Sequence, residues 1–284
     1  MTATAYAKVN LTLEVLGARD DGFHEIRSVV VPVSLADTLE VEAARDGAVA
    51  CDSGFPDDLC VRAALALRDE LAGRIGGDAM RLGARISVAK RIPSGGGLGG
   101  GSADAAATLS ALNALWGAGL SREELAAVGA RVGSDVPALA LGGAVVMEGR
   151  GERVSRLASA APELHFVLAN PGVPSSTAQV YAACSPRGAG RPSATADMVA
   201  ALASSDVGEI AAAMSNDLHP AAAGLHPEIA AAADALSKAG ARGVMASGSG
   251  STVFGLVGSE REASEVAAKA AAAGLWTAAV RSVG

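Results

Sequence analysis

The chain has 284 residues, of which 50% are hydrophobic, so it can bury a substantial core as one large domain or two ordinary ones. Its formal net charge of -7 offers no basic surface to a phosphate backbone, so we expect no nucleic-acid partner. The N-terminus has no basic segment followed by an apolar block, and no stretch approaches about 18 uninterrupted apolar residues. We therefore expect a cytoplasmic protein without a membrane partner.

Cysteine usage limits the function further. Cys51, Cys60 and Cys184 are an odd number at wide spacing and include no C-x-x-C pair. This pattern indicates neither a disulfide framework nor a zinc cluster. It fits a reducing compartment.

The first predicted element is a strand. Val9, Leu11 and Leu13 fall on one face of it, whereas Lys8 and Asn10 fall on the other. An alternation with a period of two is typical of a half-buried strand, so Lys8 and Asn10 share its polar face.

The remaining elements follow from apolar periodicity and turn residues. Up to the middle of the chain we expect strands at 26–33 and 38–43, a helix at 59–74, a strand at 84–92, helices at 102–116 and 121–131, a hairpin at 143–157 and a strand at 164–169. Thereafter we expect a flexible loop at 185–193, helices at 195–214, 221–239 and 260–273, and strands at 243–246, 252–257 and 275–281. This order predicts an α+β fold with a domain boundary near residue 155, giving domains 1–155 and 156–284.

The segment 93–106, PSGGGLGGGSADAA, carries the strongest chemical signal. It lies between a strand pattern and a helix pattern, and every position from 95 to 101 except Leu98 is glycine. Without Cβ atoms the backbone can approach a ligand and present several N–H donors, and the helix N-terminus adds partial positive charge. We therefore predict a polyphosphate site, with a flexible or tightly packed loop as the alternative.

Two familiar loop classes do not fit this segment. Gly95, Gly97 and Gly100 have the spacing of the dinucleotide fingerprint, but that motif needs a strand after the helix, where a second helix is expected here. A nicotinamide-dependent oxidoreductase is therefore disfavoured. The Walker loop is excluded because no Gly-Lys-Ser/Thr closes the run, so a lysine from elsewhere must meet the phosphates. Lys8 is a candidate.

Asp135, in the segment GSDVPAL, is the candidate carboxylate. It could serve as base or orienting acceptor for a hydroxyl that receives a phosphoryl group, or simply cap the helix that begins near Pro137. The small-residue segment 246–252, ASGSGST, could support phosphates or substrate, or form a plain turn. His24 and Tyr181 could stack on a base or play structural roles.

Taken together, the segments AYAKVNLTLEVLGARDDGFHEI, PSGGGLGGGSADAA and MASGSGSTVFG resemble the three motifs of the GHMP kinase superfamily in their usual order. The pair Lys8 and Asn10, the GFHEI turn, the GSDVP segment and NDLHP at 216–220 are similar to the members that act on 4-diphosphocytidyl-2-C-methyl-D-erythritol. The resemblance implies a two-domain α+β fold, with a ribosomal-S5-like N-terminal domain and a ferredoxin-like C-terminal domain.

The resemblance also implies an activity. ATP would phosphorylate the C2 hydroxyl of that substrate, giving the 2-phosphate and ADP in the non-mevalonate route to isoprenoid precursors. Asp135 would be the base, and Lys8 would keep its carboxylate ionised. Mg²⁺ would bridge the phosphates, with Ser102 near the metal and Asp104 as the other nearby carboxylate. The protein would be a monomer or a weak homodimer.

The resemblance assigns binding residues by position. The ATP phosphates would be wrapped by Pro93, Ser94, Gly95, Gly96, Gly97, Leu98, Gly99, Gly100, Gly101, Ser102 and Ala103. The substrate would be bound by Asn10, Phe23, His24, Thr177, Tyr181, Ser247 and Gly248. Among these, His24 would read the cytosine edge, while Tyr181 and Phe23 would flank the ring. One position departs from the family: Asp58 stands where an asparagine usually contacts adenine.

Other functions stay open from the sequence. A second kind of GHMP kinase would act on homoserine, mevalonate or a sugar, and would need no cytidine. A nucleotide-binding regulator without catalysis would bind ATP regardless of Asp135.

Overall fold

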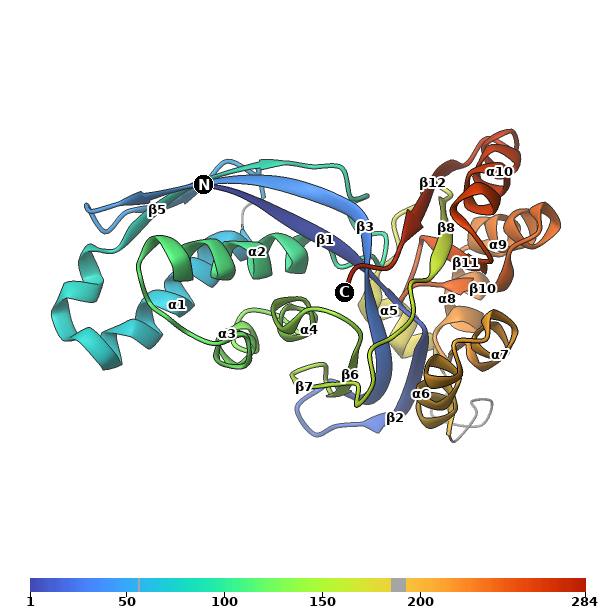
Figure 1. Ribbon diagram of the computed structural model, residues 1–284, viewed down its shortest axis with the longest axis horizontal. Helices are drawn as coiled ribbons and strands as arrows, with labels where there is room; N and C mark the ends of the chain where they lie inside the picture. The colour runs from blue at the N-terminus through green and yellow to red at the C-terminus, as the bar shows by residue number, and fades with distance from the viewer. Residues whose placement is uncertain (56, 185–192) are drawn as a thin grey trace.

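The computed structural model describes residues 1–55, 57–184 and 193–284 (Figure 1). The loop expected at 185–193 lies almost entirely outside these ranges. Two sheets, one of eight strands and one of four, lie toward opposite ends of the molecule. The mixture of helices and sheets confirms the predicted α+β class. Among the described residues, none of the helices combines the length and apolarity needed to cross a bilayer.

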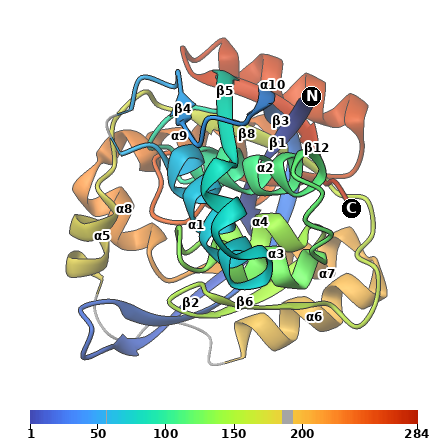
Figure 2. The same ribbon diagram turned by 90° about the vertical axis from the view of Figure 1, so that its left-hand side faces the viewer.

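The N-terminal half forms most of the eight-stranded sheet and the helices that cover it. Its strands are β1 (Thr2–Asn10), β2 (Thr12–Ala18), β3 (His24–Ala44), β4 (Val49–Cys51), β5 (Gly83–Ala89), β6 (Val145–Gly149) and β7 (Arg153–Arg156). Its helices are α1 (Leu59–Ile75), the short 3-10 helix η1 (Gly76–Arg81), α2 (Gly100–Leu115), α3 (Arg122–Gly129) and α4 (Val136–Leu141). Figure 2 shows α1 to α4 together in front of the sheet.

The central strand β3 corrects the two separate strands expected at 26–33 and 38–43. It is continuous over 21 residues because each part has a partner: β2 and β6 pair with its first part, and β1 and β5 with its second. Ala36 and Asp37, in the expected gap, pair with Tyr6 and Ala5 of β1. Pairing with β1 therefore keeps this stretch extended.

The half-buried strand expected at the N-terminus is also corrected. The chain forms two strands, β1 and β2, on either side of Leu11, and residues 7–15 are buried whichever way they point. Lys8, Asn10 and Thr12 are therefore enclosed polar groups. A polar face that is buried marks an internal site rather than a solvent surface.

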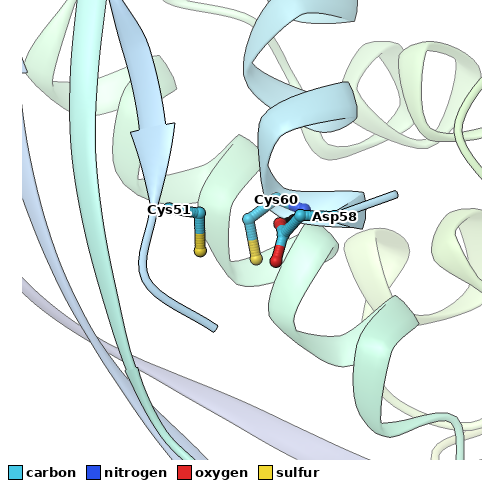
Figure 3. Close-up of side chains that lie close together, drawn as sticks. All are labelled: Cys51, Asp58 and Cys60. Atoms are coloured by element: carbon cyan, nitrogen blue, oxygen red, sulfur yellow. Dashed lines mark hydrogen bonds between the residues drawn. The ribbon is translucent and has the colours of Figure 1, made fainter. Parts of the chain in front are cut away.

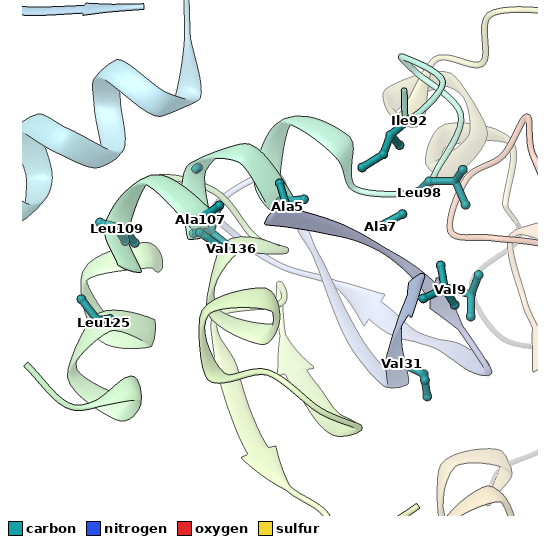
Figure 4. Packing of buried hydrophobic residues seen from close by; sticks show 14 of the residues in the cluster. Ala5, Ala7, Val9, Val31, Ile92, Leu98, Ala107, Leu109, Leu125 and Val136 are labelled. Carbon is teal, nitrogen blue, oxygen red and sulfur yellow. The ribbon is translucent and has the colours of Figure 1, made fainter. Parts of the chain in front are cut away.

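Helix α2 lies directly against β1 (Figure 4). Small side chains meet at this contact: Ala5 and Ala7 on the strand, and Ala103, Ala106 and Ala107 on the helix, are all buried. Alanine permits a close approach between the two backbones, and denser packing follows from it. The first turn of α2 is thereby held next to Lys8.

The C-terminal half contains the ferredoxin-like arrangement that the resemblance implied. The chain runs β8 (His165–Asn170), α9 (Pro227–Ala239), β10 (Arg242–Ala246), β11 (Val253–Val257), α10 (Glu260–Ala271) and β12 (Trp276–Arg281). The strand order β10-β11-β8-β12 is antiparallel throughout. In β8, Phe166 and Leu168 join the core of the N-terminal half, whereas Val167 and Ala169 pack under α9 and α10. Burial on both faces explains its unbroken apolar sequence.

Between β8 and α9, the structure adds a helix that was not expected, α5 (Thr177–Ala183). The helices that follow are shorter than expected: α6 (Ala194–Ser204), α7 (Val207–Ala213) and α8 (His219–Leu225). The helix expected at 195–214 breaks where Ser205 has a φ of 59° and Asp206 caps α7. The helix expected at 221–239 breaks before Pro227, which begins α9 because proline suits a first turn and not an interior.

The two halves are joined by backbone pairing. The two-residue strand β9 (Ser215–Asn216) pairs in parallel with β2, and Val33 of β3 forms a bridge with Ser282 near the C-terminus. Along the chain, the N-terminal half leads into the C-terminal half between the end of β7 at Arg156 and the start of β8 at His165. The boundary near residue 155 remains a prediction.

Candidate active site

A cavity of about 980 Å³ lies where the two halves meet. Its lining comes from β1, the loop before α2, the start of α4, helix α5 and the loop after β10. The predicted site residues on its wall are Lys8, Asn10, Phe23, His24, 93–102, Asp135, Thr177, Tyr181 and Gly248. Ala103 and Ser247 are buried behind this lining. Segments far apart in the sequence thus face one space.

Lys8 and Asp135 meet in this cavity. The Nζ atom of Lys8 lies 3.4 Å from Oδ2 of Asp135, and the side chains are 4% and 30% exposed. Asp135 occupies the position before α4, but its side chain makes no capping hydrogen bond. Of the two roles considered for Asp135, the geometry therefore disfavours the cap.

Neighbouring groups fix the position of Lys8. Its Nζ donates to Oδ1 of Asn10 at 2.7 Å, and Nδ2 of Asn10 donates to Oγ of Ser28 at 2.9 Å. Its backbone N–H donates to the carbonyl of Leu98 at 3.0 Å. A Cβ atom at Gly99 would lie 3.1 Å from two carbons of the lysine chain, so glycine leaves room for it. The lysine is thereby preorganised toward Asp135.

The glycine loop is supported by the small-residue loop at 246–252. Oγ of Ser247 donates to the carbonyl of Gly97 at 3.0 Å, and the N–H of Thr252 donates to the carbonyl of Gly96 at 3.1 Å. Gly97 has a φ of 76°, and a Cβ atom there would overlap the carbonyl oxygen of Ser247. Only glycine allows this approach. The structure therefore places Ser247 behind the glycine loop and away from the cavity.

Lys90 forms a second charged group, which the sequence did not reveal. Its Nζ lies 2.5 Å from Oδ2 of Asp37 and 2.6 Å from Oδ2 of Asp104. Burial raises the pKa of Asp104 to about 7, and the charge of Asp37 adds to this while Lys90 opposes it. Oδ1 of Asp104 is buried without a hydrogen-bond partner among the residues described. Asp104 therefore forms an ion pair with Lys90, in addition to any interaction of its carboxylate with the dipole of α2.

Aromatic groups occupy another wall of the cavity. The rings of His24 and Tyr181 stack, with centroids 4.8 Å apart at 29°. The guanidinium of Arg150 lies 5.1 Å from the ring centre of Phe23. Burial raises the pKa of Tyr181, and the charge of Asp135 adds to the effect, so its hydroxyl stays protonated. Thr177 lies nearby, with its hydroxyl 2.9 Å from that of Ser249.

Asp58, the residue that departs from the family pattern, caps α1. Its Oδ1 accepts from the N–H groups of Cys60 at 2.6 Å and Val61 at 3.1 Å, and Ser53 donates its hydroxyl to Oδ2. Asp58 also lines the cavity. Its Oδ1 is engaged with its own helix and its Oδ2 with Ser53, which leaves adenine contact as an unsupported expectation.

Two family models match the chain: the GHMP kinases N terminal domain over residues 58–143 and the GHMP kinases C terminal domain over residues 198–274. The chain is 42% identical, over 95% of its length, to 4-diphosphocytidyl-2-C-methyl-D-erythritol kinase of Pelotomaculum thermopropionicum, 93% of which is covered. The chain belongs to the GHMP kinase family. The same-named enzyme of Symbiobacterium thermophilum is 44% identical, with 93% of this GHMP kinase and 92% of the relative covered.

Solved structures agree with this family and fold. A crystal structure of 4-(cytidine 5'-diphospho)-2C-methyl-D-erythritol kinase matches with a TM-score of 0.81 at 37% identity and covers both chains fully. Homoserine kinase from Cytophaga hutchinsonii matches with a TM-score of 0.75 at 19% identity, covering 99% of this kinase and 94% of that chain. The latter likeness shows the shared fold alone.

Proposed function

We propose that this GHMP kinase transfers the γ-phosphoryl group of ATP to the C2 hydroxyl of 4-diphosphocytidyl-2-C-methyl-D-erythritol, in the non-mevalonate route to isoprenoid precursors. The observation that carries the proposal is the meeting of three groups on one cavity: the glycine loop, the Lys8 and Asp135 pair, and the stacked His24 and Tyr181 rings. Relatives more than 40% identical carry that enzyme's name.

ATP fits the glycine loop and the start of α2. The loop approaches its neighbours too closely for side chains at Gly96 and Gly97, and α2 has 16 residues, so its N-terminus offers oriented N–H groups and partial positive charge. Residues 93–103 would hold the phosphates. The adenine contacts are unassigned, because Asp58 is occupied as a helix cap.

Mg²⁺ fits the oxygen ligands beside this loop. Ser102 and Asp104 line the cavity, and Oδ1 of Asp104 is buried without a hydrogen-bond partner among the described residues. Hydroxyl and carboxylate oxygens are ligands that Mg²⁺ accepts. These two residues would hold the ion, which would neutralise negative charge on the phosphates.

Asp135 and Lys8 would carry the transfer. The acceptor oxygen forms a bond to the γ-phosphorus, its proton passes to the carboxylate of Asp135, and ADP leaves. The Lys8 ammonium, 3.4 Å from Oδ2 of Asp135, stabilises negative charge on the acceptor oxygen. Because Asn10 and the glycine loop already hold Lys8, this stabilisation needs little reorganisation.

The acceptor would bind across the aromatic wall. Tyr181 and Phe23 offer faces for a cytosine ring, and His24 offers ring nitrogens to its polar edge. Asn10, Thr177 and Gly248 line the same cavity and would contact the polyol or the diphosphate. Ser247 would act indirectly, by supporting Gly97. Cytoplasmic location and a monomer or weak homodimer remain predictions.

The test is ADP release from ATP and Mg²⁺ with three acceptors in parallel: the cytidine-linked methylerythritol, homoserine and mevalonate. We expect turnover with the first alone. Turnover with either of the others would assign a different kinase reaction, and ATP binding without turnover on any acceptor would favour a regulator.

A further inference from the structure

Three side chains with metal-binding atoms meet at the start of α1, beside the large cavity (Figure 3). Cys51 ends β4, Asp58 caps α1, and Cys60 is the second residue of that helix. One sulfur or oxygen atom from each residue lies within 4.8 Å of the others. The wide cysteine spacing gave no indication of this cluster, which forms because β4 and α1 bring distant positions together.

The cluster combines two thiols with an ionised carboxylate. Burial would raise the pKa of Asp58, but hydrogen bonds from Ser53, Val61 and Cys60 outweigh it and leave the pKa lowered. Burial and the charge of Asp58 raise the pKa of both thiols. Without a metal, the cluster therefore has one negative charge next to two protonated thiols. A cation that binds there would displace the two thiol protons.

The ligand chemistry selects a class of cation. Sulfur ligands suit zinc-like ions and do not suit Mg²⁺ or Ca²⁺. In a tetrahedral zinc site, metal–sulfur distances of about 2.3 Å put ligand atoms roughly 3.8 Å apart. The ligand atoms of Cys51, Asp58 and Cys60 all lie within 4.8 Å of one another. They would have to move inward only slightly to reach these distances. Cys51 is partly exposed, so water can reach a fourth position.

Asp58 can bind a metal without releasing its helix. Its Oδ1 accepts both N–H groups of α1, whereas Oδ2 accepts the hydroxyl of Ser53. The oxygen that caps and the oxygen available to a metal are therefore different atoms. An asparagine here would keep the cap and lose the charge.

We propose that Cys51, Asp58 and Cys60 bind one divalent cation of the zinc class at the rim of the nucleotide cavity. Each thiol loses its proton to solvent, both sulfurs and one carboxylate oxygen bind the ion, and no oxidation occurs. Proton release makes binding stronger at higher pH. The site lies outside the phosphoryl-transfer machinery, so the proposal does not depend on the proposed reaction.

The test is titration of the full-length, reduced protein with Co²⁺ under argon, followed by visible and near-ultraviolet absorption. We expect one Co²⁺ per chain, a thiolate-to-cobalt charge-transfer band and tetrahedral bands, all displaced by Zn²⁺. Cys51→Ser and Cys60→Ser should remove the charge-transfer intensity stepwise. Asp58→Asn, which keeps the helix cap, should weaken binding at least about tenfold.

Cys184→Ser is the matched control, because its thiol lies in another part of the fold, and it should bind Co²⁺ like the wild type. Absence of the bands from the wild type would overturn the proposal. So would full bands in Cys51→Ser, wild-type affinity for Co²⁺ in Asp58→Asn, loss of the bands in Cys184→Ser, or a Cys51–Cys60 disulfide forming in place of metal binding.

Discussion

At the scale of single residues, the charge pair in the cavity is built from one rigid partner and one accessible partner. Lys8 is almost fully enclosed and hydrogen-bonded to Asn10, whereas Asp135 is 30% exposed toward the cavity. A reacting hydroxyl can therefore reach the carboxylate while the ammonium stays in place. This asymmetry suits a base that must exchange a proton with substrate and then with solvent.

Asp135→Asn removes the proposed base but preserves the shape of the side chain. We expect turnover to fall by about 10²–10⁴-fold, while the affinity for ATP and the melting temperature change little, because Asp135 caps no helix with its side chain. Steady-state ADP release and equilibrium titration with ATP measure the two effects. Activity close to wild type, or loss of the folded state, would contradict the role given to Asp135.

Tyr181→Ala removes the ring stacked on His24. We expect the KM for the cytidine-linked acceptor to rise by about 10-fold or more, since stacking of a base on an aromatic ring contributes about 1–3 kcal/mol. The KM for ATP should stay near its original value. Tyr181→Phe is the control, because it keeps the ring, and an equal loss in that variant would show that the hydroxyl matters instead.

Sequence reasoning reached the residues that sit in local motifs. Lys8, the glycine loop and Asp135 could be found because each stands in a short pattern with a chemical reason. Lys90 could not, because its partners Asp37 and Asp104 come from a distant strand and from the helix beyond the loop. Such clusters depend on strand pairing that no local pattern specifies.

At the scale of elements, the glycine loop and the loop at 246–252 act as one unit. Gly97 lies against the carbonyl of Ser247, which in turn donates its hydroxyl to Gly97. The N-terminal half supplies the glycine loop, and the C-terminal half supports its conformation.

Gly97→Ala tests this contact. The added Cβ would overlap the Ser247 carbonyl, so we expect a lower melting temperature and a marked loss of ATP affinity. Gly95→Ala is the matched control: Gly95 has a similar φ of 68° but nothing within 4 Å of an added Cβ, so only backbone strain of about 1–2 kcal/mol applies. Equal effects of the two substitutions would argue against the interlocked loops.

Element type was easier to predict than element continuity. The hairpin at 143–157, the helix at 59–74 and the strand-loop-helix around the glycines are present. The length of β3 and the breaks at Ser205 and Pro227 were missed, since strand continuity depends on neighbours and alanine-rich sequence looks equally helical on both sides of a break. The prediction of alternating buried and exposed side chains was also wrong at residues 7–15. The polar side chains there are enclosed within the protein instead of facing solvent.

At the scale of the whole molecule, a hydrogen bond between α8 and β10 of the C-terminal half depends on a neutral histidine. His219, at the start of α8, accepts a hydrogen bond at Nδ1 from the N–H of Ala246, next to the loop that supports Gly97. Burial lowers the pKa of His219. Protonation would remove this acceptor and place a charge in a buried position.

The unfolded chain therefore binds a proton at His219 more readily than the folded chain. The stability that this residue contributes is fully present above its unfolded pKa of about 6.5 and is lost as pH falls below it. We expect the free energy of unfolding, measured by urea titration, to decrease more steeply on acidification in the wild type than in His219→Asn, which keeps an acceptor but cannot titrate. Parallel pH profiles would contradict this.

The most direct test of the whole account is the ³¹P NMR spectrum of the product formed from ATP and 4-diphosphocytidyl-2-C-methyl-D-erythritol. C2 of the acceptor carries a methyl group and no hydrogen, so a phosphate placed there has no proton three bonds away. The account predicts a new phosphomonoester signal that is a singlet without proton decoupling. A doublet or triplet would place the phosphate on another carbon, and no new signal would contradict the proposed transfer.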